Sequence, residues 1–318
     1  MRAFSRFAWF VLAYQLAVVA WGALVRATGS GAGCGGHWPL CNGAVLPRAP
    51  AAATLIELAH RATSGIALLL VLAVFVWARR AIPRGHAARH AAAASLAFIV
   101  LEALLGAALV LFGWVAMDDS PSRAWAMSLH LVNTFLLLGA LALAAAWSGD
   151  RPDEVAGAPG ALPLWVGAAL VATLLAGVTG AVAALGDTLF PATSFAEGLR
   201  QELAPGARVL LKLRIVHPFA ALVAAALVGA VAFLAPRLRP ARHVRGMATA
   251  VLAVVVLQVV AGAVNVILLA PVWLQLVHLA LAELVWIGLV TVGAWTLAPG
   301  GLQVPVGGRG GLGVPASP

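Results

Sequence analysis

The sequence predicts an all-α polytopic membrane protein with eight transmembrane helices, and three observations lead to this fold class. The residues are 63% hydrophobic and only 10% charged, with a mean hydropathy of +1.00, far outside the range of soluble domains. Apolar runs long enough to cross a hydrocarbon core of about 30 Å recur along the chain. The charged residues gather in short segments between these runs, as expected of loops at a membrane surface.

The expected spans cover most of the chain, and the flanking charges orient them. Their ranges are 7–26, 56–78, 91–115, 124–147, 162–186, 208–235, 247–270 and 272–297. Basic segments at 2–6, 78–90 and 236–245 fall on one side, which the positive-inside rule makes cytoplasmic. Both termini are then expected inside the cell, with the protein in the cell membrane. Because topology signals explain the net charge of +9, no nucleic-acid partner is predicted.

The chain contains signs of an internal duplication. Two long outer loops, 27–55 and 187–207, each follow the first span of a group of four. The similar segments are GALVRA (22–27) and GAVAAL (180–185), and EALLG (102–106) and QVVAG (258–262). Four spans return the chain to its starting side, so the two units share one orientation. We therefore expect two tandem, pseudo-symmetric four-helix bundles.

Four histidines fall inside predicted spans, at similar depths below the outer surface. They are His60, His130, His217 and His278. Ionisable groups within spans are rare and usually functional, and a hydrogen bond to a neighbouring helix explains a single such residue better than four. One histidine on the second helix and one on the fourth helix of each bundle suit ligation of a haem iron by two imidazoles. Zinc is less well explained, because it needs further protein ligands.

The first outer loop, GSGAGCGGHWPLCNG (29–43), contains both cysteines of the chain, Cys34 and Cys41. Facing an oxidising compartment, the two thiols can form a disulfide across the loop. A metal pair and a reactive dithiol are the alternatives, and zinc is disfavoured because no further cysteine is present. A disulfide here is either structural or able to exchange with a reductant.

The segment IELAHRATSG (56–65) places an acid, a histidine and an arginine at the start of the second span. Glu57 and His60 are three residues apart and therefore share one face of a helix. Glu57 is a candidate catalytic residue that moves protons or steers water. Alternatively, it stabilises the helix start through the dipole and, with Thr54, as a capping box. Arg61 is expected to reach the surface or a haem propionate.

The sequence RATGSGAGCGGHWPLCNGAVLP, followed by IELAHRATSG, resembles the haem A synthase family, in its cysteine-pair-containing bacterial and archaeal type. Segments 178–192, 211–225 and 268–286 resemble that family too, and the similarity covers all eight spans. The resemblance implies a membrane oxidoreductase that oxidises a methyl group of haem O to a formyl group. The product, haem A, serves terminal oxidases. The family fold is two similar four-helix bundles.

The resemblance also implies a role for each part of the chain. Residues 1–150 would form a bundle with the substrate haem site and the disulfide loop, residues 151–298 a bundle with a haem b cofactor, and residues 299–318 a Gly/Pro-rich disordered tail. The residue roles carried over are His60 and His130 at the iron of haem O, His217 and His278 at the iron of haem b, Glu57 as the catalytic acid, and Cys34 and Cys41 as the disulfide.

Two features depart from the family pattern. The second outer loop lacks the cysteine pair of some members, and Pro218 follows His217 where Arg61 follows His60. The halves are therefore not equivalent, as expected if one is catalytic. The implied partners are a haem O synthase that delivers the substrate and an electron donor, with a homo-oligomer as a further expectation.

Two other classes of protein compete with this interpretation. A di-haem cytochrome b in electron transfer explains the four histidines equally well, but not Glu57 or the disulfide loop, and it prefers haems on opposite sides of the membrane. A transporter built from repeats is the third class. Transporters often break helices at the midplane, and this sequence contains little such interruption.

Overall fold

The computed structural model describes residues 1–149, 160–207 and 209–297, and the regular structure in these ranges is helical. Eight helices of the described part of the chain are long and apolar enough to cross a membrane. They are α1 (Arg2–Ala27), α2 (Ala52–Ala81), α3 (Ala87–Leu111), α4 (Pro121–Ser148), α5 (Leu162–Leu189), α7 (Val209–Leu238), α8 (Arg242–Ile267) and α9 (Val272–Leu297). The expected all-α, multi-pass fold is confirmed, whereas the tail expected at 299–318 lies outside the described residues.

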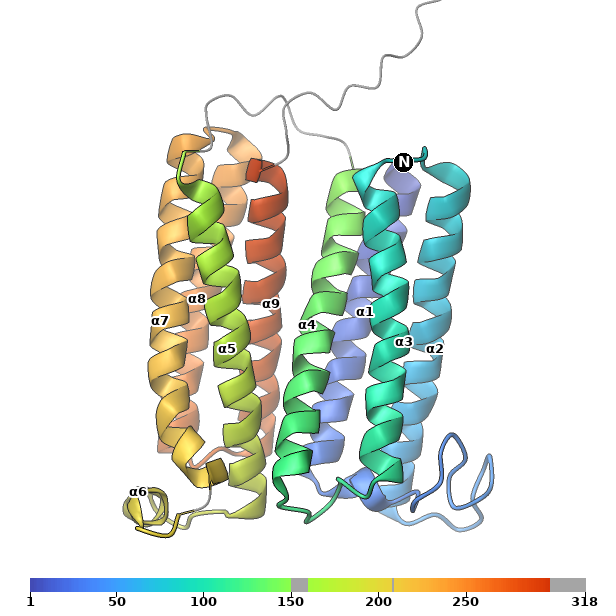
Figure 1. Cartoon of the computed structure of the whole chain (residues 1–318), viewed down its shortest axis with the longest axis vertical. Coiled ribbons are helices and arrows are strands. Elements are labelled where there is room, and N and C mark those ends of the chain that lie inside the picture. Colours follow the sequence, from blue (N-terminus) through green and yellow to red (C-terminus); the bar gives the residue numbers. More distant parts are fainter. Residues whose placement is uncertain (150–159, 208, 298–318) are drawn as a thin grey trace, which may run out of the picture.

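The long helices stand in two groups of four (Figure 1). One group contains α1, α2, α3 and α4, and the other contains α5, α7, α8 and α9, with α4 and α9 next to the boundary between them. The loop between α1 and α2 lies at the membrane face opposite the N-terminus, and α6 lies at that same face. This grouping agrees with the expected bundles, while their pseudo-symmetry stays a prediction.

The two groups share a buried contact between α4 and α9. The indole of Trp286 stacks at an angle against Phe135, with ring centroids 5.5 Å apart. Its Nε1–H donates to the Phe135 carbonyl at 2.5 Å. Gly139, one turn further along α4, leaves room for this indole, because a Cβ there would lie 3.2 Å from Nε1. The groups therefore pack through close contact rather than through a loose lipid-filled gap.

A half-buried arginine joins the two groups near the face that carries the loops. Arg26, at the end of α1, donates to the Ala184 carbonyl at 2.7 Å and to the Thr188 hydroxyl at 2.8 Å, both on α5. It also donates to Gln275 Oε1 on α9 at 2.8 Å. A guanidinium offers five donors in a fixed fork, so one side chain can bond to both helices at once.

The helix ends differ from the expected spans by up to five residues. The third helix was expected at 91–115 but begins at Ala87 and ends at Leu111. It ends there because Gly113 adopts φ +71°, and Trp114 N–H donates to the Leu109 carbonyl at 2.8 Å, which is a Schellman arrangement. It begins four residues before the expected start because the turn with Arg89 and His90, which was assigned to the polar loop, is helical too.

The second outer loop contains a short helix that the sequence analysis did not predict, α6 (Phe195–Leu203). Its start follows the capping-box pattern. The Ser194 hydroxyl accepts from Glu197 N–H at 3.2 Å, and the Glu197 carboxylate accepts from Thr193 N–H at 2.8 Å. Apolar periodicity over nine residues is too short to indicate a span, so only this local signal could have revealed the helix.

Candidate functional site

Each of the four predicted histidines packs against a glycine of a neighbouring helix. The pairs are His60 with Gly22, His130 with Gly106, His217 with Gly180, and His278 with Gly262. A Cβ at Gly22, Gly180 or Gly262 would lie only 2.8–3.0 Å from the Cε1 atom of its imidazole. Such distances are closer than side chains tolerate, so glycine is required for these imidazoles to lie where they do.

His130 lies beside a carboxylate. Its Nδ1 is 2.9 Å from Glu102 Oε1 on α3. The same carboxylate accepts from Asn133 Nδ2 at 2.5 Å and from the Thr134 hydroxyl. A carboxylate at one imidazole nitrogen orients the ring and leaves the other nitrogen, Nε2, available to a metal.

The other two histidines, His217 and His278, face each other across the second group of helices. Their ring centroids are 6.3 Å apart and their planes are at 83°. Polar side chains stand beside both rings: the Thr179 hydroxyl is 3.3 Å from His217 Nδ1, and Gln258 Nε2 is 3.5 Å from His278 Nε2. Gln258 therefore lies beside His278 of α9 as Glu102 lies beside His130 of α4.

The first outer loop is closed by a disulfide between Cys34 and Cys41, and both cysteines are buried. Asn42 N–H donates to the Cys34 carbonyl at 2.9 Å, which tightens the ring. Of the alternatives for this cysteine pair, the structure therefore contains the disulfide. Gly33 packs directly on the start of α2, where a Cβ would lie 2.5 Å from the Ala53 carbonyl, so the loop covers this helix end closely.

Glu57 is buried under the disulfide loop, one turn before His60 on α2. Only 3% of the residue is exposed. Its Oε2 accepts from Cys34 N–H at 2.8 Å, and its Oε1 accepts from the Arg61 guanidinium at 2.5 Å. The carboxylate therefore has fixed partners on both sides, which hold it in one position.

Arg61 holds the disulfide loop against α2. Its Nη1 donates to the carbonyls of His37 and Leu40 at 2.7 and 2.8 Å. The capping box considered as an alternative for Thr54 and Glu57 is wrong, because α2 begins at Ala52 and the Thr54 hydroxyl donates to the Gly33 carbonyl at 2.8 Å. The polar start of the second span thus serves the loop rather than the helix cap.

Ion pairs take the place of a disulfide at the second outer loop. Arg214 on α7 lies 2.9 Å from the Asp187 carboxylate and 3.9 Å from Glu202, and it donates to the Phe190 carbonyl at 2.9 Å. Burial raises the pKa of the Glu202 carboxyl, and the positive charge of Arg214 opposes this rise. Arg61 and Arg214 each hold one of these two loops by hydrogen bonds. Of the two described loops, only the first lies over a carboxylate one turn from a histidine, Glu57 beside His60.

The donors in the second group fit a six-coordinate metal of the haem type. Two imidazoles on opposite sides of one metal would have centroids about 6 Å apart, since each metal–nitrogen bond is roughly 2 Å and each centroid lies about 1 Å further out. The distance between His217 and His278 agrees. Among the described residues, no cluster of three or more histidine, cysteine or acidic side chains suits a metal without a porphyrin.

A family model matches nearly the whole chain. The model of COX15-CtaA, described as cytochrome oxidase assembly protein, matches residues 5–290. The chain belongs to this family. The family resemblance read from the disulfide loop and the Glu57–His60 segment is thereby confirmed.

Curated relatives of this COX15-CtaA protein bear two kinds of name. The chain is 48% identical over 302 residues to a protoheme IX farnesyltransferase of Thermus thermophilus, a match that covers 95% of the chain and 50% of the relative. It is also 46% identical over 108 residues to a heme A synthase of Geobacillus kaustophilus, covering 33% of the chain and 34% of the relative. The chain thus spans about half the length of the Thermus relative, and the similarity to heme A synthases supports a part in haem A biosynthesis.

Two acidic residues of the COX15-CtaA protein lie outside the predicted set of site residues. The Glu102 carboxylate lies beside His130. Its position four residues before Gly106, in the segment that resembles QVVAG, was the available signal. Glu283 is 1% exposed, and its Oε1 has no hydrogen-bond partner in the described structure.

Replacing Gly180 by alanine is expected to displace His217. The added Cβ would lie 2.8 Å from the imidazole, and such overpacking costs about 1–3 kcal/mol. Haem content of the purified protein, measured as the pyridine haemochrome, should fall. The matched control is Gly167→Ala on the same helix, where the Cβ meets no atom within 4 Å. Equal haem content in both variants would contradict a role for His217 in haem binding.

Proposed function

We propose that this COX15-CtaA protein is a haem A synthase, which oxidises a methyl group of haem O to a formyl group. The observation that carries the proposal is the position of Glu57, buried one turn from His60 and held between Cys34 N–H and Arg61. An electron-transfer cytochrome needs paired histidines, but it does not need a fixed carboxylate next to one of them.

The first group of helices is proposed to bind haem O as substrate. His60 on α2 and His130 on α4 would bind its iron, and the Glu102 carboxylate would hold the ring of His130 in place. Conversion of a methyl to a formyl group requires two hydroxylations and loss of water, and each step moves protons. Glu57 is proposed to accept or return them, and its burial beside the disulfide loop supports this role.

The second group is proposed to hold a resident haem b between His217 and His278. When bound there, haem b would supply electron transfer. The residues contribute the two iron ligands, and the glycines Gly180 and Gly262 provide the space in which the imidazoles lie. In this assignment residues 1–150 form the substrate half and residues 151–298 the cofactor half, as pseudo-symmetric bundles.

The partners and orientation follow from the same proposal. A relative named protoheme IX farnesyltransferase contains a region similar to nearly this whole chain. Such a prenyltransferase makes the haem O that this chain would consume, so we expect it to deliver the substrate. The basic segments at 78–90 and 236–245 support the proposal that the N-terminus lies in the cytoplasm and the disulfide loop outside the cell membrane.

Replacing Glu102 by glutamine tests the support of the substrate ligand. The first half would then resemble the second, where Gln258 stands beside His278. Loss of a carboxylate that orients a ligating histidine typically weakens metal binding about 10–100-fold. Titration of haem O into the purified variant should show this loss while the content of haem b is unchanged. If Glu102→Gln bound haem O with the affinity of the wild type, Glu102 would have no role in binding this substrate.

Expression in cells that make haem O but lack haem A tests the proposed activity. Haem extracted from these cells and separated by liquid chromatography should contain haem A, or its hydroxylated precursor, only when the protein is present. Cells that assemble the protein with bound haem b and contain haem O alone would contradict the synthase proposal and favour the di-haem cytochrome.

A further inference from the structure

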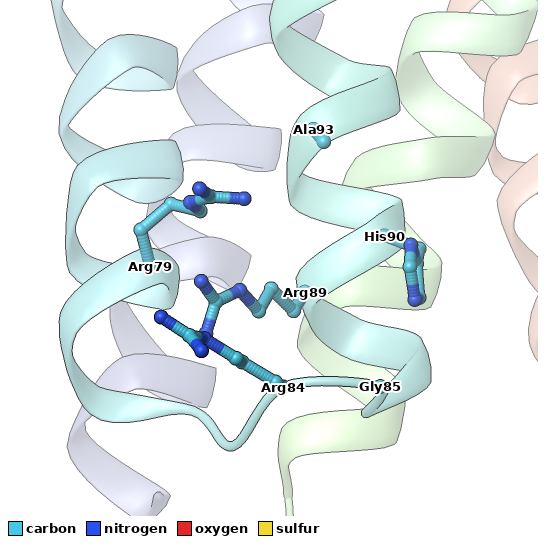
Figure 2. A pocket seen from close by; sticks show the side chains of 6 residues that line it. All are labelled: Arg79, Arg84, Gly85, Arg89, His90 and Ala93. Atoms are coloured by element: carbon cyan, nitrogen blue, oxygen red, sulfur yellow. The ribbon is translucent and has the colours of Figure 1, made fainter.

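A pocket lined by basic side chains lies at the turn between α2 and α3, on the membrane face that carries the N-terminus (Figure 2). Its volume is about 340 Å³, and it is lined by Arg79, Arg84, Gly85, Arg89, His90 and Ala93. The guanidinium groups of Arg79, Arg84 and Arg89 lie near one another on one side of the turn. No carboxylate lines the pocket.

The pocket concentrates positive charge without an acidic partner. Within residues 1–149, 160–207 and 209–297, no ion pair joins Arg79, Arg84 or Arg89 to a carboxylate. Arg79 contacts the ring of Phe75 at 5.9 Å, and Arg89 donates to the Ile82 carbonyl at 3.1 Å. Neither contact neutralises charge, and arginine stays protonated at all relevant pH values. The three guanidinium groups therefore repel one another unless an anion lies between them.

The start of α3 adds to the positive potential. The helix has no acidic residue in its first turn, although its N-terminal dipole favours negative charge there. Arg89 and His90 instead place basic groups at this end. A phosphate oxyanion suits the surroundings, because arginine binds phosphate oxygens with two parallel hydrogen bonds.

The corresponding turn between α7 and α8 contains as many arginines but uses them differently. Arg237 lies over the ring of Phe233 at 3.3 Å and donates to the Phe233 carbonyl. Arg239 is buried and donates to the Thr296 carbonyl at 3.0 Å. If the arginines served only to orient the helices in the membrane, the two turns would be expected to arrange them in the same way. The open pocket at the α2–α3 turn therefore needs another explanation.

We infer that the α2–α3 pocket binds the phosphate of an acidic phospholipid headgroup. The pocket lies at the ends of two membrane spans, where headgroups are found. It reaches Ala93, almost two turns inside α3, so an acyl chain can continue along the apolar surface. Basic pockets between spans are typical sites for anionic headgroups. Binding there would fix the α2–α3 turn. It would thereby also fix α2, which carries Glu57 and His60.

Native mass spectrometry of the delipidated full-length protein tests this site. Phosphatidylglycerol should bind the wild type about tenfold more tightly than phosphatidylcholine, which carries no net charge. The double variant Arg84→Gln/Arg89→Gln should bind phosphatidylglycerol roughly 25-fold more weakly, since each basic residue near an acidic headgroup contributes about fivefold. The matched control is Arg242→Gln/Arg245→Gln, which removes two exposed arginines from the same membrane face and should bind like the wild type.

Three outcomes would overturn the inference. Equal weakening in both double variants would mean that surface charge acts without a site. Equal affinity of the wild type for the two lipids would mean that the pocket does not select the headgroup. Displacement of phosphatidylglycerol by micromolar inorganic phosphate would identify free phosphate as the ligand in place of a lipid.

Discussion

Glu57→Gln is expected to stop formation of haem A while bound haem is retained. The amide oxygen of glutamine can still accept from Cys34 N–H, as Glu57 Oε2 does at 2.8 Å, so the loop should keep its position. The variant loses the negative charge that faces Arg61 and cannot take up or return a proton. General acid–base groups contribute about a hundredfold to ten-thousandfold, and haem A in a chromatographic assay should fall accordingly.

A matched variant separates the carboxylate from the loop it holds. Thr54→Val removes the hydroxyl that donates to the Gly33 carbonyl and leaves Glu57 untouched. It should keep activity within a few-fold of the wild type, because Asn42 also donates to that carbonyl. Two results would count against Glu57 as a proton carrier: wild-type haem A from Glu57→Gln, or an equal loss of activity in Thr54→Val.

Alanine at His278 and alanine at His60 are expected to produce two different defects. His278→Ala removes a proposed ligand of the resident haem, so the purified protein should lose haem b and its low-spin absorbance bands. His60→Ala should retain haem b, because His217 and His278 are intact, but should neither hold haem O nor make haem A. Absorbance spectra and the pyridine haemochrome distinguish the two cases.

The assignment of the halves depends on this contrast. Loss of haem b in His60→Ala together with its retention in His278→Ala would exchange the roles of the two bundles. His37→Ala is the control, since this exposed histidine contributes only its backbone carbonyl to Arg61. It should change neither the haem content nor the haem A yield.

The sequence predicted the long helices well, for a physical reason. A bilayer core requires about 20 apolar residues per helix, so spans can be read directly from composition. Inside such spans a histidine is conspicuous because it is costly there. The structure places each of the four histidines next to a glycine of a neighbouring helix, and their role as haem ligands stays a prediction.

Contacts between helices could not be predicted in the same way. Glu102 is 28 residues from His130 in the chain, and its carboxylate reaches the imidazole only because α3 and α4 pack face to face. Likewise, Arg61 lies beside Glu57 on α2, but its hydrogen bonds to the carbonyls of His37 and Leu40 depend on how the loop folds back. The charge of a single residue does not reveal such partners. The glycine that follows four residues after both Glu102 and Gln258 was a sequence signal that pointed to their places beside the histidines.

Oxidation of haem O by the purified protein tests the central claim most directly. The protein, carrying its own haem b, would be incubated aerobically with haem O and a reductant, and the extracted haem would be followed by mass spectrometry. The account predicts that haem O disappears as its hydroxylated form and then haem A appear, and that Glu57→Gln leaves haem O unchanged. Haem O that stays intact while haem b is reduced and reoxidised would contradict the account and identify an electron-transfer protein.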